Sequence, residues 1–264
     1  MALNIIVCVK NTPTTTNVGV DPATGKVKSQ GLVYGMNPFD EYAVEEAVRL
    51  KERVPGSTAT ALTVGPESSD SVLRDAVSRG CDGGVLVAAP ELENAGSYAT
   101  SYALAQAIKK LHAQKPVSLV LFGKNTNDGN SGVVGAETAA WLDWPSAISI
   151  KKIDQIDDAS ATVHRMMEDG VDVLKVSLPA CLSTTKEINE PRLPSLKGKM
   201  ASKKAAIPKM TGAELGLNPA ELQPSVVTKN ASPAPRPAGV KIDGATGVEK
   251  AKKLVDVLIE RKLI

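Results

Sequence analysis

The sequence is poor in the residues that most metal-centred and nucleophilic chemistry requires. Its 264 residues include three cysteines, Cys8, Cys81 and Cys181, and two histidines, His112 and His164. The cysteines form no C-x-x-C pair, so neither a disulfide framework nor a zinc site is indicated, and we expect all three to be small buried hydrophobic residues. Two isolated histidines without clustered ligands predict no metal centre and are expected to lie on the solvated surface.

An excess of charge and long apolar runs are also lacking. Lys and Arg total 31 against 29 Asp and Glu, a formal net charge of +2, which gives no electrostatic footprint for nucleic acid or an anionic membrane. The apolar runs at 5–9 and 117–122 are far shorter than the roughly 20 residues that span a bilayer. No leader-like segment precedes the first strand-like run, so a cytoplasmic protein without stable membrane insertion is expected.

What the sequence does contain is a regular alternation of strand-like and helix-like segments. The predicted strands are residues 4–9, 59–64, 84–87, 119–122 and 147–150, and the predicted helices are residues 40–52, 70–78, 97–111 and 133–142. Continuous apolar strands suit burial on both faces. The pattern predicts an α/β fold with a doubly wound, mostly parallel Rossmann-like sheet. Segments 161–167 and 171–178 flank the turn Glu168-Asp169-Gly170 and predict an added antiparallel hairpin.

Three regions are expected along the chain. Residues 1–186 carry the α/β pattern. Prolines and lysines dominate residues 187–206, which are expected to protrude because prolines remove backbone donors and the charges need water. Residues 207–264 are expected to be an extended C-terminal arm, with a Pro-, Ala- and Ser-rich stretch at 225–239 and a final amphipathic helix.

The strongest candidate site is the glycine-rich loop after the fourth predicted strand. In an open parallel sheet, ligands bind beyond the carboxyl ends of the strands, where the strand order switches. The loop from Gly123 to Gly135 contains four glycines and opens directly into a helix. Glycines allow close backbone approach, and free amides at a helix start favour a phosphate. The loop therefore predicts phosphate binding, with an ordinary glycine-rich turn as the alternative.

Other chemistry finds less support. The loop lacks both the P-loop and the strict G-x-G-x-x-G pattern, and the segment after the first strand lacks the phosphate loop of ATP pyrophosphatases. No nucleophile with a neighbouring base can be assembled, which argues against a hydrolase. Asn37, Pro38 and Asp40 are expected to begin a helix, with Asn37 as its cap. The run Asn37 to Asp40 either does only that or also points polar groups at an adenine or ribose.

Several segments jointly resemble one family across almost the whole chain. They are Val7-Cys8-Val9-Lys10, Met36 to Asp40 running into Ala43 to Ala47, the Gly123 to Gly135 loop with Leu142 to Pro145, Val163 to Leu174 continuing to Pro179 to Ser183, and Asn189-Glu190-Pro191-Arg192. Together they resemble the electron-transferring flavoprotein beta-subunit family. The resemblance implies an electron carrier subunit without catalytic residues of its own, paired with an alpha subunit that carries a redox-active FAD.

The resemblance also implies specific contacts. Residues 1–186 would bind an adenine nucleotide, and residues 207–264 would pack on the alpha subunit. Residues 187–206 would be a partner-recognition loop, with Leu196 anchoring in an acyl-CoA dehydrogenase-type flavoenzyme. The implied nucleotide contacts are Cys8, Asn37, Pro38, Phe39, Asp40, Val64, Thr126, Asn127, Asp128, Gly129, Asn130, Ser131, Gly132, Val133, Val134 and Gly135, with the loop reaching Glu137.

The identity of the nucleotide is left open by the resemblance. Some members hold AMP, and electron-bifurcating members hold a second FAD. The stretch 128–131 with Val134-Gly135 resembles the bifurcating pattern, whereas 125–127 and 12–15 depart from it, and AMP is slightly favoured. Met166 stands where some members carry a Glu that touches the partner's flavin domain, so that contact is not expected. A nucleotide-sensing module without a redox role is a further alternative.

Overall fold

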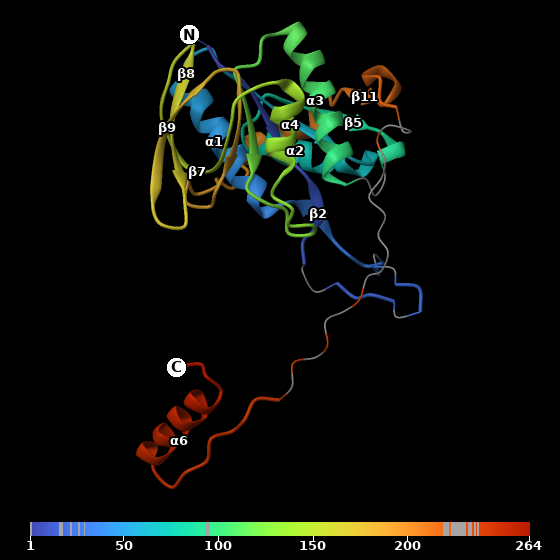
Figure 1. Ribbon diagram of the computed structural model, residues 1–264. Coiled ribbons are helices and arrows are strands. Elements are labelled where there is room, and N and C mark those ends of the chain that lie inside the picture. The colour runs from blue at the N-terminus through green and yellow to red at the C-terminus, as the bar shows by residue number, and fades with distance from the viewer. Residues whose placement is uncertain are drawn as a thin grey trace.

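The computed structural model describes residues 2–15, 18–21, 23–25, 27–28, 30–92, 96–218, 222, 231, 234, 236 and 238–264. Within them a central sheet has the strand order β11-β5-β4-β1-β6-β10-β7-β8-β9 (Figure 1). Its strands are β1 (Asn4–Cys8), β4 (Thr58–Val64), β5 (Gly83–Ala88), β6 (Leu119–Gly123), β7 (Ser146–Ile156), β8 (Ser160–Met166), β9 (Val171–Ser177), β10 (Ala180–Thr184) and β11 (Lys209–Thr211). Strands β2 (Asn11–Pro13) and β3 (Tyr34–Met36) form a separate antiparallel pair.

The pairing confirms the predicted fold class. The strands from β11 to β7 pair in parallel, and β8 pairs antiparallel with both β7 and β9. The predicted strand pair around Glu168-Asp169-Gly170 is the β8–β9 hairpin. Parallel strands require crossover connections, and helices supply most of them here.

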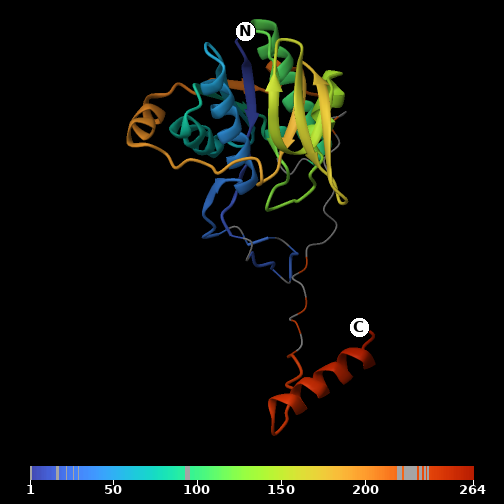
Figure 2. The same ribbon diagram turned by 90° about the vertical axis from the view of Figure 1, so that its left-hand side faces the viewer.

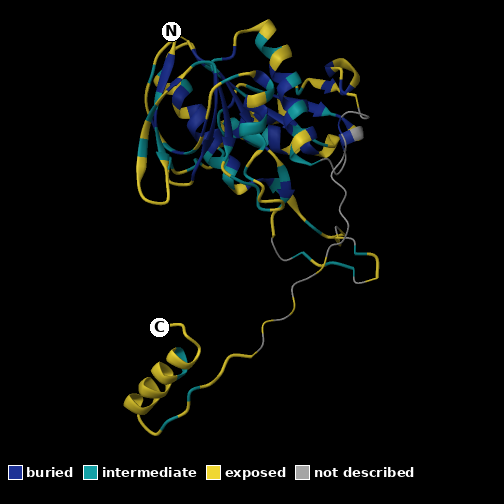
Figure 3. Ribbon diagram, viewed as in Figure 1, coloured by how far each residue is buried: buried dark blue, intermediate teal, exposed yellow. Residues whose placement is uncertain are grey.

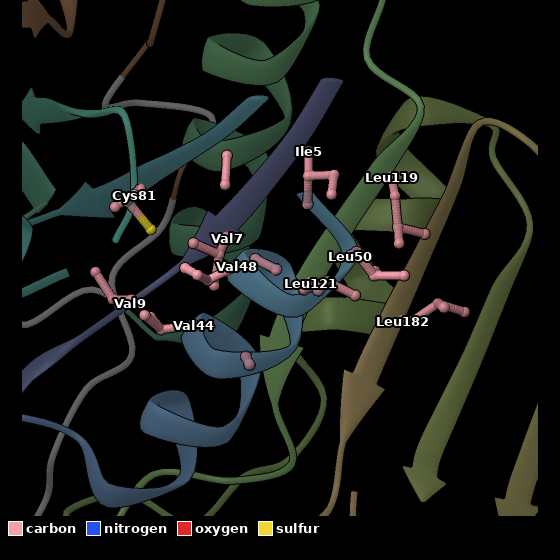
Figure 4. Close-up of a cluster of buried hydrophobic side chains, with 14 of the residues drawn as sticks. Ile5, Val7, Val9, Val44, Val48, Leu50, Cys81, Leu119, Leu121 and Leu182 are labelled. Carbon is pink, nitrogen blue, oxygen red and sulfur yellow. The ribbon is translucent and has the colours of Figure 1, made fainter. Parts of the chain in front are cut away.

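Helices cover both faces of the sheet, as a doubly wound arrangement requires. They are α1 (Pro38–Arg53), α2 (Asp70–Arg79), α3 (Ser97–Gln114) and α4 (Val134–Leu142), joined by α5 (Leu196–Lys204) and α6 (Gly247–Glu260). One buried cluster lies under α1 and α2, and a second lies under α3 and α4. Figure 4 shows the first, where Val44 and Val48 of α1 meet Val7 of β1. Burying such a side chain contributes about 1.5–3 kcal/mol, so the α1 contact fixes that helix firmly on the sheet.

The three cysteines and His112 can now be placed in the fold. All three cysteines are free and buried, as predicted. His112, expected on the solvated surface, is partly exposed. It also accepts a hydrogen bond at Nδ1 from the Val117 amide at 3.0 Å and packs its ring against Trp144, at the point where the chain turns from α3 toward β6.

Three elements differ from the sequence expectation. Residues 196–204 were expected to be an irregular protruding stretch but form α5, because Ser195 caps the helix by accepting a hydrogen bond from the Gly198 amide at 2.9 Å. Strand β10 was not predicted and lies fully buried between β6 and β7. Strand β11 falls inside the expected arm but extends the sheet beside β5.

The final helix is separate from the sheet. No residue of α6 is buried, and Figure 3 shows it exposed almost throughout, away from the buried strands. Its apolar side chains Val248, Leu254, Val255 and Ile259 are exposed. Most of the Pro-, Ala- and Ser-rich stretch expected at 225–239 lies outside the described residues. Within the described residues, no helix has both the length and the apolar character needed to traverse a bilayer.

Candidate functional site

The strand order places one ligand site by topology. From β1 the chain builds outward to β4 and β5 on one side, and then returns to add β6 and β10 on the other. The order therefore switches between β1 and β6, and ligands of such sheets bind at the carboxyl ends of the strands at that switch. The loops that leave those ends are residues 9–37 after β1 and residues 124–133 after β6.

Asn37 joins these two loops. Its side chain is fully buried. Its Nδ2 donates to the Asn125 carbonyl at 2.8 Å, and its Oδ1 accepts from the Asn127 amide at 3.2 Å. The expected capping role was wrong: Asn37 occupies the N-cap position of α1 but makes no side-chain capping bond. Both ends of its amide are committed to the glycine-rich loop, so the side chain forms a wall of the site.

Asp40 connects the first turn of α1 to the carboxyl ends of β1 and β6 through hydrogen bonds. It is 5% exposed, and its Oδ2 accepts from the Lys10 amide at 2.8 Å. Burial raises the pKa of Asp40 to about 7, against hydrogen bonds from the Asn37 side chain and the Lys10 and Gly123 amides. A Cβ on Gly123 would meet the Asp40 carboxylate and come within 2.7 Å of the Phe39 carbonyl carbon, so only glycine fits there.

Two further contacts close the loop over the end of β1. Lys10 Nζ and Asp128 Oδ2 form an ion pair at 2.7 Å. Burial acts to raise the pKa of Asp128, but hydrogen bonds from Lys10 and Thr126 and the Lys10 charge hold it below its usual value. Asn127 Nδ2 donates to the Pro13 carbonyl at 2.8 Å. The structure thus gathers Lys10, which follows β1, and residues from β2, α1 and the glycine-rich loop around one site.

The end of the loop offers backbone donors. Helix α4 begins at Val134 with Val133 at its N-cap and no side-chain capping bond, so its first amides are not satisfied by a side chain. Asn130 and Gly132 adopt positive φ values of 50° and 66°, which turns the chain sharply into the helix. This geometry suits an anionic group such as a phosphate.

Several polar atoms near these loops are buried without a hydrogen-bond partner. They include Asn11 Oδ1, Thr12 Oγ1 and Asn127 Oδ1. Thr12 is 1% exposed, so its hydroxyl cannot turn to bulk solvent. Unsatisfied buried polar groups are costly, and a polar ligand in the site is one way to satisfy them. The residues present therefore fit a nucleotide with its phosphate at the start of α4.

The remaining predicted contacts lie at the same edge of the sheet. Cys8 ends β1 and Val64 ends β4, and both side chains belong to or pack on the core under α3. Burial is the largest cause that raises the pKa of the Cys8 thiol well above its usual value, and the nearby Cys181 and Asp40 raise it further. Cys8 thus packs in the core at the end of β1. Pro38 and Phe39 form the first turn of α1.

Sequence reasoning missed part of the site. Lys10 and Asn125 take part in closing it, but neither was predicted as a contact of the nucleotide. The available signal was their position directly after strands β1 and β6, which flank the switch point.

A second candidate surface lies on α5, at the side of the domain next to α2 (Figure 2). Leu196 is its first residue and is 77% exposed, with Leu193 and Met200 also exposed. Leu196, Met200 and Ala201 line a shallow hollow together with Lys197 and Lys204. Exposed apolar side chains beside lysines are typical of transient protein-docking surfaces.

Comparison with known proteins gives a consistent result. Residues 24–215 match the Electron transfer flavoprotein domain. The chain is 35% identical to the caffeyl-CoA reductase-Etf complex subunit CarD of Acetobacterium woodii, covering 99% of this chain and 100% of the relative. It is 32% identical to the electron transfer flavoprotein subunit beta of Megasphaera elsdenii, with 99% and 100% coverage. It is also 32% identical to protein FixA of Azotobacter vinelandii, with 89% and 85% coverage.

Proposed function

This chain belongs to the electron transfer flavoprotein family as a beta subunit, and we propose that it holds an adenine nucleotide between the loops that follow β1 and β6. Beta subunits of this family work in electron transfer with an alpha subunit and redox partners. The observation that carries the proposal is the pair of hydrogen bonds from Asn37 to Asn125 and Asn127, which closes the glycine-rich loop at the switch point.

The chain's own residues have binding roles in this proposal. The amides at the start of α4 and the ammonium group of Lys10 neutralise the nucleotide phosphate. The side chains of Asn37 and Asp40 hold the two loops at a fixed separation. The FAD of the heterodimer supplies the electron-accepting and electron-donating chemistry when bound, so this subunit is an electron carrier component without catalytic residues.

AMP is the proposed occupant of this subunit. Asn125 and Asn127, which depart from the bifurcating pattern, are the residues that bind the loop to Asn37 and Pro13. The alternative is a second FAD, as in electron-bifurcating members, and the run Asp128 to Ser131 favours it. A nucleotide-sensing module without a flavin partner is the third candidate, since the site offers hydrogen-bond donors to a phosphate but has no nucleophile.

We place the docking of a redox partner on α5. Leu196 would enter an apolar pocket of an acyl-CoA dehydrogenase-type flavoenzyme, while Lys197, Lys199, Lys203 and Lys204 steer the encounter. One relative is named as part of a caffeyl-CoA reductase complex, which supports a flavoenzyme acting on CoA thioesters as the class of partner. The exposed apolar face of α6 would pack on the alpha subunit.

Co-expression with the alpha subunit encoded in the same organism tests the function. We expect a yellow heterodimer whose flavin is bleached by an acyl-CoA dehydrogenase supplied with its acyl-CoA substrate. A colourless preparation without bound nucleotide would reject the electron-carrier role. A stable homo-oligomer that binds ATP without flavin would support the nucleotide-sensing alternative instead.

A further inference from the structure

The α5 segment is attached to the domain through polar contacts rather than through the apolar core. Residues 189–205 run along α1 and α2 and include α5, in which Ser202 is the only buried residue. A surface segment of this composition has little apolar area to stabilise it. Its conformation therefore depends on the hydrogen bonds and ion pairs that the two helices supply.

Arg192 makes the largest set of these contacts. Its guanidinium donates to Glu45 from Nε at 2.8 Å and from Nη2 at 3.1 Å. It also donates to Glu52 from Nη1 at 2.6 Å and from Nη2 at 3.0 Å, and its hydrogen bond lowers the pKa of Glu52. The Glu45 side chain is only 7% exposed. Such a fork is a strong and directional contact that lysine cannot reproduce.

Two other side chains tie the start of the segment. Asn189 Nδ2 donates to the Tyr42 carbonyl at 3.0 Å and to Glu46 Oε2 at 3.1 Å, both on α1. Arg79 of α2 pairs with Glu41 at 2.8 Å and donates to the Arg192 carbonyl at 3.2 Å. The chain before α5 is thus bound to both helices.

The far end of the segment is fixed by α2. Arg74 donates from Nη1 to the Ser202 carbonyl at 2.6 Å and to the Ala205 carbonyl at 3.1 Å, at the carboxyl end of α5. Gly198 lies so close to the Ser78 carbonyl that any Cβ would overlap it. With both ends held, the side chains of Leu196 and Met200 are left exposed.

Helix α1 connects this segment to the nucleotide site. Its first turn carries Asn37 and Asp40, which build the site, and its acidic side holds Asn189 and Arg192. We infer that α1 is a shared frame that keeps the α5 segment preformed at a fixed position relative to the nucleotide, with Arg192 and Glu45 as its positioning residues. The inference rests on the proposed docking role of α5. A preformed segment loses less conformational entropy on docking.

Backbone hydrogen exchange of residues 189–205 in the purified heterodimer tests the inference. Arg192→Met removes the fork but keeps an aliphatic stem, and we expect these amides to exchange about tenfold faster or more, as loss of charge-assisted hydrogen bonds implies. Arg192→Lys should show a smaller increase. The matched control is Arg49→Met: Arg49 is exposed on the same helix and makes no hydrogen bond or ion pair with the described residues. Nucleotide content should be unchanged in all three.

Electron transfer from an acyl-CoA dehydrogenase supplies the second readout. Arg192→Met should raise the apparent KM for the dehydrogenase with little change in kcat. Arg192→Lys should raise this KM less than Arg192→Met does. Unchanged exchange in Arg192→Met overturns the inference. If Leu196→Ala raises KM but Arg192→Met does not, the positioning inference alone fails. If neither variant raises KM, the docking surface itself is rejected, and the inference with it.

Discussion

The carboxylate of Asp40 accepts a hydrogen bond from the backbone amide of Lys10 at 2.8 Å, which ties the first turn of α1 to the end of β1. Lys10 in turn reaches across to Asp128 of the glycine-rich loop at 2.7 Å. Asp40, Lys10 and Asp128 therefore link the helix, the chain that leaves β1 and the loop that is proposed to hold the phosphate.

The Asp40 carboxyl should make stability depend on pH. Its pKa in the folded protein is raised to about 7, so the folded state retains a proton that the unfolded state loses near pH 4. Its contribution is favourable below pH 4 and is lost as the pH rises to about 7, with a slope of at most about 1.4 kcal/mol per pH unit.

Asp40→Asn should flatten the slope between pH 4 and 7. Urea denaturation across this range measures the free energy of unfolding. The control is Asp158→Asn, an exposed carboxylate in the turn between β7 and β8. An unaltered slope in Asp40→Asn would show that Asp40 is not the titrating group.

Asn37→Ala should weaken nucleotide binding. Removal of both side-chain hydrogen bonds leaves the loop without its attachment to α1, and the expected loss of affinity is about tenfold or more. Calorimetric titration of nucleotide-depleted heterodimer with AMP gives the affinity. Asn4→Ala is the matched control, because Asn4 lies at the opposite end of β1 and bonds to the Lys115 carbonyl. Equal affinities for the two variants would contradict the proposed role.

Lys10→Met should affect the phosphate rather than the adenine. We expect AMP affinity to fall about tenfold, the scale of a charge-assisted hydrogen bond, while adenosine affinity falls less, because adenosine loses only the loop closure by the Lys10–Asp128 ion pair. Lys110→Met, on α3, serves as a charge control. A parallel loss of AMP and adenosine affinity would place Lys10 outside the phosphate site.

Leu196→Ala should impair docking without impairing assembly. Truncation of an anchoring side chain at the centre of an interface costs about 2 kcal/mol or more, so the apparent KM for the dehydrogenase should rise roughly thirtyfold. Size-exclusion chromatography should still give a heterodimer. Leu193→Ala is the control, because it removes a comparably exposed leucine three residues earlier. A larger rise in KM for Leu193→Ala than for Leu196→Ala would identify Leu193 as the anchoring residue instead.

The sequence predicted most of the sheet because β1, β5 and β6 are largely apolar and β4 is rich in β-branched residues, both of which are typical of buried parallel strands. It did not predict β10, because Ser183 and Thr184 are polar and Pro179 precedes the strand. That segment becomes a strand only through pairing with β6 and β7.

The candidate site was predictable to a similar extent. The glycine spacing located the loop, but its closure by Asn37 is a contact between residues 88 positions apart. The Arg192 fork joins residues 147 positions apart. No local sequence pattern predicts contacts between residues so far apart in the sequence, since these contacts depend on how the whole chain packs.

The most direct test of the central claim is acid extraction of the purified heterodimer, with the released nucleotides identified and counted. We predict one AMP for each FAD, both in equal ratio to the protein. Two FAD and no AMP would contradict AMP as the occupant and favour the bifurcating alternative. One FAD with no second adenine nucleotide would contradict the nucleotide site itself.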